Sequence, residues 1–273
     1  MATYVKWQVA SRLLGGEFIR PWIKGSRFVV RAGETGITGN IYTGLQEYPD
    51  MGYLLHVLRA DDGFADVGAN AGAYSILASA VVGATTWAFE PVPATFRRLD
   101  DNVRINRMEL LVQHRNIALG REPGRIRFTS ELDTVNHALA DGEHAAAEIE
   151  VAVSTLDAEL GADRPAVIKI DVEGFEKPVL DGGVTLLADE RLHSVILELN
   201  GSGARYGYGD GEIVGLMRDH GFGTYSYDPM GRRLIDLAGR SLTEGNTLFL
   251  RNLGLIEARI RDAPRVPVLD KML

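Results

Sequence analysis

The stretch from Phe64 to Val82 constrains the fold of this chain more than any other part of the sequence. A short apolar run, Phe64-Ala-Asp-Val67, is followed by glycines at positions 68 and 72 and then by an uncharged, largely apolar segment. This order predicts a buried strand, a tight turn and a helix, the first half of a βαβ unit. Such a turn brings backbone N–H groups and a helix N-terminus close to a bound ligand.

The residues of this turn indicate a ligand other than a nucleotide phosphate. The pattern Gly68-x-Asn70-x-Gly72 differs from the G-x-G-x-x-G of dinucleotide enzymes, and no Lys-Ser or Lys-Thr pair follows it as in a P-loop. Asp66 instead places a carboxylate near the end of the strand. A site with a carboxylate and no cation suits a cationic ligand without phosphates. S-adenosylmethionine, which carries a sulfonium and an ammonium, fits that description.

A second acidic residue strengthens this interpretation. The next predicted strand, Thr85-Thr-Trp-Ala-Phe89, is followed by Glu90, which lies 22 residues after Gly68. This is close to the offset of about 20 residues at which an acid meets the ribose hydroxyls in nucleotide-binding βαβ units. Two acids at matching positions indicate a binding site more strongly than one.

Strands and helices alternate along most of the remaining sequence. Apolar runs at 110–118, 165–172 and 194–200 predict three further parallel strands. The alternation is typical of an α/β fold, in which a mainly parallel sheet carries helices on both faces and binds ligands at the carboxyl ends of its strands. Polar residues lie at or beside five such ends, namely Asp66, Glu90, Asn116, Asp171 and Glu198–Asn200.

Two pairs of segments interrupt the alternation and are expected to form antiparallel strands. Residues 125–129 and 148–153 predict paired strands around a polar insert at 130–147. Residues 224–227 and 246–250 predict an antiparallel edge of the sheet.

The chain is expected to consist of one main domain with additions at both ends. Residues 1–45 are expected to form an N-terminal extension with a helix and with a hairpin of 27–31 and 37–42. This extension is a candidate cap over the site. The main domain is expected at 46–255, and 256–273 shows no strong pattern and is assigned as a tail.

Composition excludes several classes of protein. The 273 residues are 45% hydrophobic and 24% charged with a net charge of −8, which argues against a nucleic-acid binder because such proteins depend on Lys and Arg. The absence of cysteine excludes disulfides, thiolate metal sites and cysteine nucleophiles. The uncharged run from Gly72 to Phe89 is divided by Gly83, so no stable membrane insertion is expected. Without an evident signal peptide, a cytoplasmic protein is expected.

Several motifs together resemble the FkbM family of S-adenosylmethionine-dependent methyltransferases. The resemblance covers about residues 50–200, and its most specific block is Ile168-Lys-Ile-Asp-Val-Glu-Gly-Phe-Glu176. It also rests on residues 64–75, Phe89-Glu-Pro91, Ser154-Thr-Leu-Asp157 and Ile196-Leu-Glu198. The resemblance implies a class I, Rossmann-like methyltransferase fold with seven strands, the last antiparallel, and O-methylation of a sugar, glycolipid or other natural product.

The resemblance also assigns roles to individual residues. Asp66, Gly68, Asn70 and Gly72 would hold the methionine end of S-adenosylmethionine, and Tyr74 directly after them joins the cofactor-binding set. Further along the chain, Glu90 would bind the ribose hydroxyls, and Asn116 with Ile117 would border the adenine. Asp171 and Glu173 would lie beside the transferring methyl.

The base that takes the proton of the acceptor hydroxyl is open among three residues, Asp171, Glu173 and His137. Lys169 is expected to form an ion pair rather than act as the base. A Mg²⁺ held by Asp171, Glu198 and Asn200 is an alternative, but a site without metal is favoured.

The acceptor itself is not fixed by the sequence, and a small molecule or glycan is expected. The segment 200–209 is rich in tyrosine and glycine, and it either stacks on a sugar ring or serves as a flexible connection. Two further functions stay open, an NAD(P)-dependent oxidoreductase or epimerase and a non-catalytic binding module. A homodimer is one expected assembly.

Overall fold

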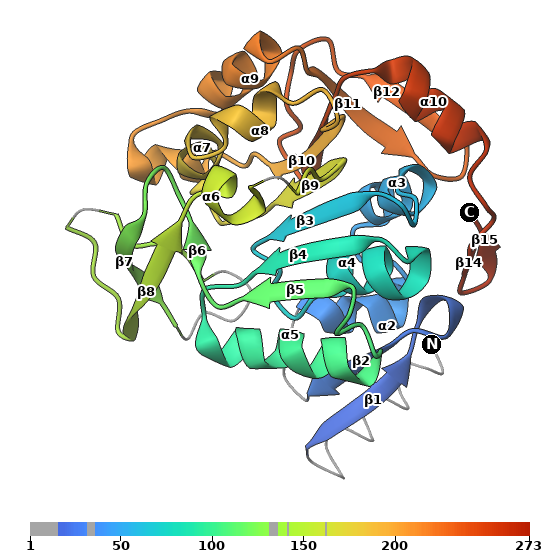
Figure 1. The fold of residues 1–273 in the computed structure, drawn as a ribbon, viewed down its shortest axis with the longest axis horizontal. Helices are drawn as coiled ribbons and strands as arrows, with labels where there is room; N and C mark the ends of the chain where they lie inside the picture. The colour runs from blue at the N-terminus through green and yellow to red at the C-terminus, as the bar shows by residue number, and fades with distance from the viewer. Residues whose placement is uncertain (1–15, 32–35, 131–135, 141, 162) are drawn as a thin grey trace.

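The computed structural model describes residues 16–31, 36–130, 136–140, 142–161 and 163–273, so most of the N-terminal helix expected within residues 1–25 lies outside the described residues. An eight-stranded sheet forms the centre of the molecule (Figure 1). Its strands, in spatial order, are β12 (Arg233–Asp236), β11 (Gly223–Asp228), β13 (Asn246–Leu250), β10 (Ser194–Glu198), β9 (Val167–Ile170), β3 (Gly63–Val67), β4 (Thr85–Phe89) and β5 (Val112–Arg115).

The middle of this sheet is parallel, as the sequence predicts. β3 pairs in parallel with β4 on one side and with β9 on the other, and β9 pairs in parallel with β10. Every residue of β9 is buried, which agrees with the continuous apolar run that predicts a strand covered on both faces. The carboxyl ends of these strands therefore meet at one edge of the sheet.

The antiparallel strand implied by the family resemblance is β13. It pairs antiparallel with β10 and with β11, so the predicted pairing of 224–227 with 246–250 is confirmed. The expectation that this pair forms the edge is wrong, because β13 lies inside the sheet and all five of its residues are buried. An eighth strand, β12, pairs antiparallel with β11 and forms the edge.

Helices cover both faces of the sheet (Figure 1). One core cluster joins the sheet to α3 (Tyr48–Val57), the π-helix η3 (Ile76–Val82) that follows the short α4 (Ala73–Ser75), and α10 (Leu253–Arg261). The other core cluster joins it to α6 (Leu156–Leu160), α7 (Glu176–Asp181), α8 (Val184–Ala188) and α9 (Asp210–Asp219). Neighbouring residues of β3 belong to different clusters, Phe64 to the first and Ala65 to the second, because side chains alternate along a strand.

A small second sheet contains the predicted pair at 125–129 and 148–153. β7 (Gly124–Thr129) pairs antiparallel with β8 (Glu148–Ser154), and β6 (Ala118–Leu119) joins β8 in parallel. Of the insert between β7 and β8, the structure describes residues 130, 136–140 and 142–147.

The N-terminal hairpin differs from the prediction. β1 (Glu17–Pro21) pairs with β2 (Arg27–Arg31) around the short helix η1 (Ile23–Gly25), in which Lys24 and Gly25 have positive φ angles of 48° and 84°. The predicted partner at 37–42 is instead helical, with η2 (Gly36–Gly39) followed by α2 (Asn40–Thr43).

Two local sets of hydrogen bonds, which the sequence pattern does not indicate, explain why the hairpin differs from the prediction. The Trp22 N–H donates to the Ser26 carbonyl at 2.7 Å and closes the hairpin early. Asn40 then stabilises the helical segment, since its Nδ2 donates to the Ile37 carbonyl at 3.1 Å and its Oδ1 accepts from the Gln46 N–H at 2.8 Å. Helix α5 (Pro93–Ile105) packs against β2 at this end of the sheet.

The C-terminal residues have more structure than their weak pattern indicates. α10 buries Ile256 and Ile260, and a two-stranded hairpin of β14 (Pro267–Val268) and β15 (Lys271–Met272) follows it. Arg259 anchors α10 through an ion pair from its Nη2 to Asp62 Oδ1 at 3.0 Å. The division expected between residues 255 and 256 stays a prediction, although α10 runs across that point. Within the described ranges, every helix falls short of the length and apolar character needed to cross a membrane.

Candidate active site

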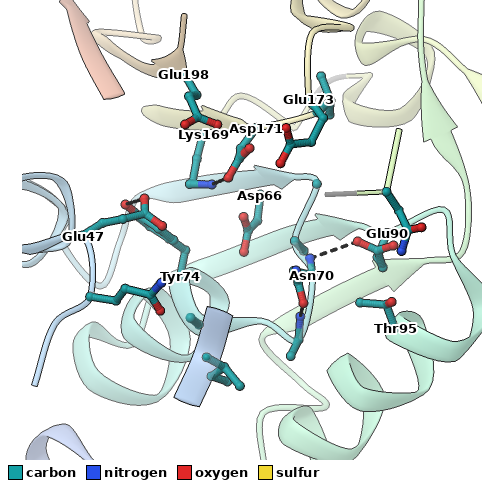
Figure 2. Close-up of a pocket in the computed structure, with 18 of the residues that line it drawn as sticks. Glu47, Asp66, Asn70, Tyr74, Glu90, Thr95, Lys169, Asp171, Glu173 and Glu198 are labelled. Carbon is teal, nitrogen blue, oxygen red and sulfur yellow. Dashed lines mark hydrogen bonds and ion pairs between the residues drawn. The ribbon is translucent and has the colours of Figure 1, made fainter. Parts of the chain in front are cut away.

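A cavity of about 310 Å³ opens at the carboxyl ends of β3, β4, β9 and β10 (Figure 2). Of the nine residues that the sequence and the resemblance assign to cofactor binding, six line it: Asp66, Gly68, Asn70, Tyr74, Glu90 and Asp171. Gly72 lies in the same turn, between the lining residues Ala71 and Ala73. The N-terminal segment closes one side with residues that include Ile37, Asn40 and Glu47.

The glycine turn is held tightly against the sheet. The N–H groups of Gly68 and Ala69 both donate to the Phe89 carbonyl at 3.0 Å. Gly68, Asn70 and Gly72 have positive φ angles of 78°, 51° and 87°. A side chain at position 68 would overlap the backbone carbonyl of Asp171, so only glycine fits between β3 and β9 here.

Glu90 is part of the turn as well as part of the cavity wall. Its Oε2 accepts from the Asn70 N–H at 3.0 Å, and its Oε1 accepts from the Val92 N–H at 2.9 Å (Figure 2). Burial raises the pKa of Glu90 to about 7, although both hydrogen bonds act in the opposite direction. A second lone pair on each oxygen leaves Glu90 able to accept from ligand hydroxyls.

Asp66 lies at the centre of the cavity floor and is almost completely buried. Its Oδ2 accepts from the Ser75 hydroxyl at 2.6 Å, which orients the carboxylate from the first turn of the following helix. Burial raises the pKa of Asp66 despite the nearby ammonium of Lys169. Sequence analysis assigns no role to Ser75, although its place in the helix after the turn is a signal for one.

The ion pair expected of Lys169 is present. Its Nζ lies 2.7 Å from Asp171 Oδ2 and 4.8 Å from the centre of the Tyr74 ring. The Lys169 side chain is almost fully buried, and burial alone lowers its pKa, but Asp171, Glu47 and Asp66 outweigh this effect and raise the pKa overall.

The carboxylate of Asp171 in this ion pair also faces the carboxylates of Glu173 and Glu198 (Figure 2). Asp171, Glu173 and Glu198 each offer an oxygen, and these oxygens all lie within 4.8 Å of one another. We call these three residues the acid cluster. Burial and the charges of Asp171 and Glu173 raise the pKa of Glu198 to about 7, and burial and Asp171 raise the pKa of Glu173.

The acid cluster differs from the predicted metal-ligand set at one residue. Asn200 is exposed, and its Oδ1 accepts from the Ser202 N–H at 3.0 Å and from the Ser202 hydroxyl. The chain turns away from the cavity after Glu198, with Gly201 at a positive φ of 80°, so the alternation of the strand does not extend to Asn200. Glu173 takes the third position instead.

Glu173 is held in an unusual backbone conformation. It has a positive φ of 54°, which costs free energy for a residue other than glycine. Glu176 Oε1 accepts from the N–H groups of Val172 at 3.2 Å and Gly174 at 3.1 Å, and the Tyr208 hydroxyl donates to the Gly174 carbonyl. This clamp presents Glu173 to the cavity.

The two tyrosines of the segment 200–209 make structural contacts, and the stacking on a sugar ring considered for this segment stays a prediction. Tyr208 is buried and supports the Glu173 turn. Tyr206 packs edge-on against Phe175 with ring centres 5.1 Å apart, and its hydroxyl donates to the Ala138 carbonyl at 2.5 Å. The two tyrosines thus support the loop after β9.

The FkbM methyltransferase domain matches residues 66–223, more than half of the chain. The chain belongs to this family. The family identified from the motifs is thereby confirmed, and the structure itself confirms the mainly parallel α/β sheet.

Two curated relatives are about 30% identical to this FkbM-family chain over the aligned stretches. Hexuronic acid methyltransferase AglP of Haloferax volcanii is 31% identical over 153 residues, which span 54% of this chain and 59% of AglP. The 31-O-demethyl-FK506 methyltransferase FkbM of Streptomyces tacrolimicus is 30% identical over 211 residues, 64% of this chain and 78% of that protein. A solved FkbM methyltransferase from Methylobacillus flagellatus aligns with 72% of this chain and 48% of its own at 14% identity and a TM-score of 0.48.

Three of the predicted site residues of this FkbM-family chain lie away from the main cavity. His137 is buried beside Glu143, with Nε2 3.1 Å from Glu143 Oε1, and the cavity is lined by its neighbour Asn136 instead. Asn116 is exposed and donates to the carbonyls of Glu90 at 2.8 Å and Pro91 at 2.9 Å.

Ile117 lines a smaller apolar cavity that shares Gly68, Pro91 and Phe128 with the main one. This smaller cavity has a volume of about 20 Å³, which is too small to hold a purine ring. The roles assigned to His137, Asn116 and Ile117 stay predictions.

Sequence reasoning missed Glu47. This residue precedes α3, and its Oε2 accepts from the Tyr74 hydroxyl at 2.7 Å and from Asn246 Nδ2 at 2.8 Å. It thereby ties the cofactor-side helix to the start of β13 and adds a carboxylate to the cavity wall. No local motif marks it, because its partners are 27 and 199 residues away in the chain.

Proposed function

We propose that this methyltransferase transfers the methyl group of S-adenosylmethionine to a hydroxyl oxygen of a sugar or related acceptor. The observation that carries the proposal is the single cavity in which the Gly68–Gly72 turn and Glu90 face the acid cluster. One side has the groups that suit the cofactor, and the other has the groups that suit proton removal.

On the cofactor side, the turn would bind the methionine end and Glu90 the ribose. Asp66 supplies a fixed carboxylate on this side of the cavity. The carboxylate of Glu90 accepts from two backbone N–H groups and can accept further hydrogen bonds from ribose hydroxyls. Ile117, which lines a small apolar space beyond this point, would border the adenine.

The charge of the cavity favours a neutral acceptor. Among the described residues that line it, six are carboxylates and one, Lys169, is a cation. The name of one curated relative, 31-O-demethyl-FK506 methyltransferase, supports an oxygen acceptor, whereas the other relative is named for hexuronic acid, which bears a carboxylate. A carboxylate-bearing acceptor would meet like charges here, so we assign a hydroxyl as the methylated group.

The chemistry requires alignment and removal of one proton. The acceptor oxygen forms a bond to the methyl carbon, the carbon–sulfur bond breaks, and its electron pair stays on sulfur. Holding the two reactants in line is worth about 7–11 kcal/mol of the barrier, and a positioned base about 10²–10⁴-fold in rate.

We assign the base to Glu198, which sequence reasoning considered only as a metal ligand. A base is most effective when its pKa lies near the working pH, and the pKa of Glu198 is about 7. Asp171 is engaged by Lys169 and positions the cluster, while Glu173 contributes to the raised pKa of Glu198.

We further propose that transfer needs no metal, because the ammonium of Lys169 already binds Asp171. Turnover should be unchanged after exhaustive chelation. Loss of activity that Mg²⁺ restores would support a metal held by the acid cluster instead.

The cofactor assignment can be tested without knowledge of the acceptor. S-adenosylhomocysteine, the demethylated product, should raise the melting temperature of the parent protein, since a ligand of the folded state stabilises it. The Asp66→Ala variant should lose most of this rise, and NAD should cause none. An unchanged parent melting curve, or a rise with NAD only, would support the oxidoreductase alternative or a binding module that takes neither ligand.

The acceptor assignment is tested by counting tritium transferred from methyl-labelled S-adenosylmethionine. Neutral glycosides should accept label more readily than the matching uronic acids. Preferential labelling of the uronic acids would contradict the assignment of a neutral hydroxyl.

A further inference from the structure

The acid cluster holds more negative charge than its fixed cation balances. Lys169 is ion-paired to Asp171, and its ammonium also compensates Glu47 and Asp66 in part. The described residues provide neither Glu173 nor Glu198 with a hydrogen-bond or ion-pair partner. The raised pKa values of both residues agree with this imbalance.

The protein fixes these carboxylates in place rather than letting them turn to solvent. Glu173 stays at a positive φ because Glu176 and Tyr208 clamp the turn that follows it. Asp171 is fixed by Lys169, and Glu198 lies beside Asp171 because β9 and β10 are paired neighbours. Like charges kept close at a cost in free energy indicate a ligand that removes the cost.

The cluster lies across the cavity from the groups assigned to the two ends of the cofactor. The turn at Gly68–Gly72 and the carboxylate of Glu90 lie on one side of Asp66, and Lys169 and Asp171 lie on the other (Figure 2). The sulfur joins the methionine end to the ribose end. A cofactor bound to both would therefore carry its sulfur between them, facing the acid cluster.

We propose that Glu173 and Glu198 make the site selective for the positive charge of the cofactor, so that methyl transfer itself weakens the binding of the spent cofactor. The proposal rests on S-adenosylmethionine being the ligand, as inferred above. Before transfer, the sulfonium is a cation that the cluster attracts. When the carbon–sulfur bond breaks, sulfur keeps the electron pair and becomes a neutral thioether, and that attraction is lost.

Coulomb's law sets the scale of this effect. Two unit charges about 6 Å apart at an effective dielectric constant of about 20 interact strongly enough for a change of ten- to a hundredfold in affinity. The attraction is weaker at high salt, although partly buried charges are screened less than exposed ones. Glu173 and Glu198 are both half-buried, so a salt dependence is expected but should be moderate.

The experiment compares two cofactor analogues by titration calorimetry. Sinefungin carries an ammonium near the position of the sulfonium, and S-adenosylhomocysteine is neutral there, so the ratio of their dissociation constants measures charge selectivity. We expect the parent to bind sinefungin at least tenfold more tightly. In Glu173→Gln and Glu198→Gln, the ratio should fall about three- to tenfold, with the larger part of the change in sinefungin affinity.

The control is Glu257→Gln on α10, an exposed residue away from the cavity, which makes the same change in net charge. Its ratio should equal that of the parent. Melting curves of all variants establish that each is folded, and a combined Glu173→Gln and Glu198→Gln variant should bring the ratio close to one.

Two outcomes would overturn the proposal in distinguishable ways. Equal affinities of the parent for both analogues, or an unchanged ratio in the variants, would show that the acid cluster does not select charge while leaving the cofactor assignment intact. Failure of the parent to bind either analogue would refute the proposed cofactor and the selectivity together.

Discussion

The two sides of the cavity hold their carboxylates by different means. On the side formed by β3 and β4, Glu90 accepts from two backbone N–H groups and Asp66 accepts from the Ser75 hydroxyl. On the side formed by β9 and β10, Asp171 depends on the buried ammonium of Lys169, and Glu173 and Glu198 face further carboxylates.

This difference divides the work of the site. Carboxylates fixed by backbone groups change little during a reaction and suit the binding of a constant ligand. Carboxylates that face one another without hydrogen-bond partners among the described residues are free to take up a proton or to respond to a change in ligand charge. We therefore expect substitutions on the first side to affect folding and cofactor binding, and those on the second side to affect turnover and the preference for a positively charged cofactor.

The largest effect is expected at the contact between the two sides. An alanine at position 68 would overlap the Asp171 carbonyl and would have to keep a positive φ. Gly68→Ala should lower the free energy of unfolding by about 3 kcal/mol or more, at the upper end of the usual cost of overpacking. Denaturant unfolding measures this loss. Gly215→Ala in α9, where an added methyl group meets open space, is the matched control and should be neutral or slightly stabilising.

On the acid side, Glu198→Gln tests whether Glu198 is the base. Removal of the base should lower kcat about 10²–10⁴-fold, with cofactor affinity reduced far less. Because a carboxylate with a pKa of about 7 acts as a base only when ionised, parent activity should rise as the pH increases through about 7. The variant should lack this rise. A variant that retains both its kcat and the rise would show that another group accepts the proton.

Glu90→Gln tests the opposite side. The glutamine side chain offers one acceptor oxygen, so it cannot accept from both the Asn70 and the Val92 N–H groups. Cofactor affinity should fall ten- to a hundredfold, an estimate from about 1.5–3 kcal/mol for a hydrogen bond to a charged group. Titration calorimetry measures the change. Equal affinities would mean that Glu90 supports the turn without contacting the ribose.

The smallest expected effect concerns Glu176, which clamps the turn between the two sides. Burial raises its pKa to about 7 in the folded protein, so the ionised form is disfavoured there. Its contribution to stability is therefore greatest below the unfolded pKa of about 4.3 and is lost as the pH rises to about 7. Buried Asp50 and Glu90 act in the same direction.

Glu176→Gln keeps the acceptor oxygen for Val172 and Gly174 but cannot ionise. Its melting temperature should fall less steeply than that of the parent between pH 4.5 and 7.5. Parallel curves for the two proteins would show that Glu176 does not carry this part of the pH dependence.

The sequence predicts the cofactor side of the site well because its residues are close together in the chain. Asp66, Gly68 and Asn70 belong to one strand and turn, and Glu90 follows the next strand, so a short-range pattern places them all. The parallel core of the sheet follows from continuous apolar runs in the same way. These features need no knowledge of distant contacts.

The acid side was predicted only in part because it depends on contacts between distant segments. Glu47 reaches the cavity through partners far along the chain, and Glu173 replaces Asn200 because the chain turns away after β10. The predicted pairing of the N-terminal hairpin was wrong for a related reason. The alternation of apolar residues in β2 does not show which segment is its partner. The partner is the preceding segment Glu17–Pro21, and the following segment is helical.

A crystal structure of the protein with S-adenosylhomocysteine tests the account most directly. The account predicts that the methionine end lies against the Gly68–Gly72 turn, that the ribose hydroxyls donate to Glu90, and that the sulfur faces Asp171, Glu173 and Glu198. A ligand bound outside this cavity, or one whose sulfur points away from the acid cluster, would contradict the division of the site into a binding side and a reacting side.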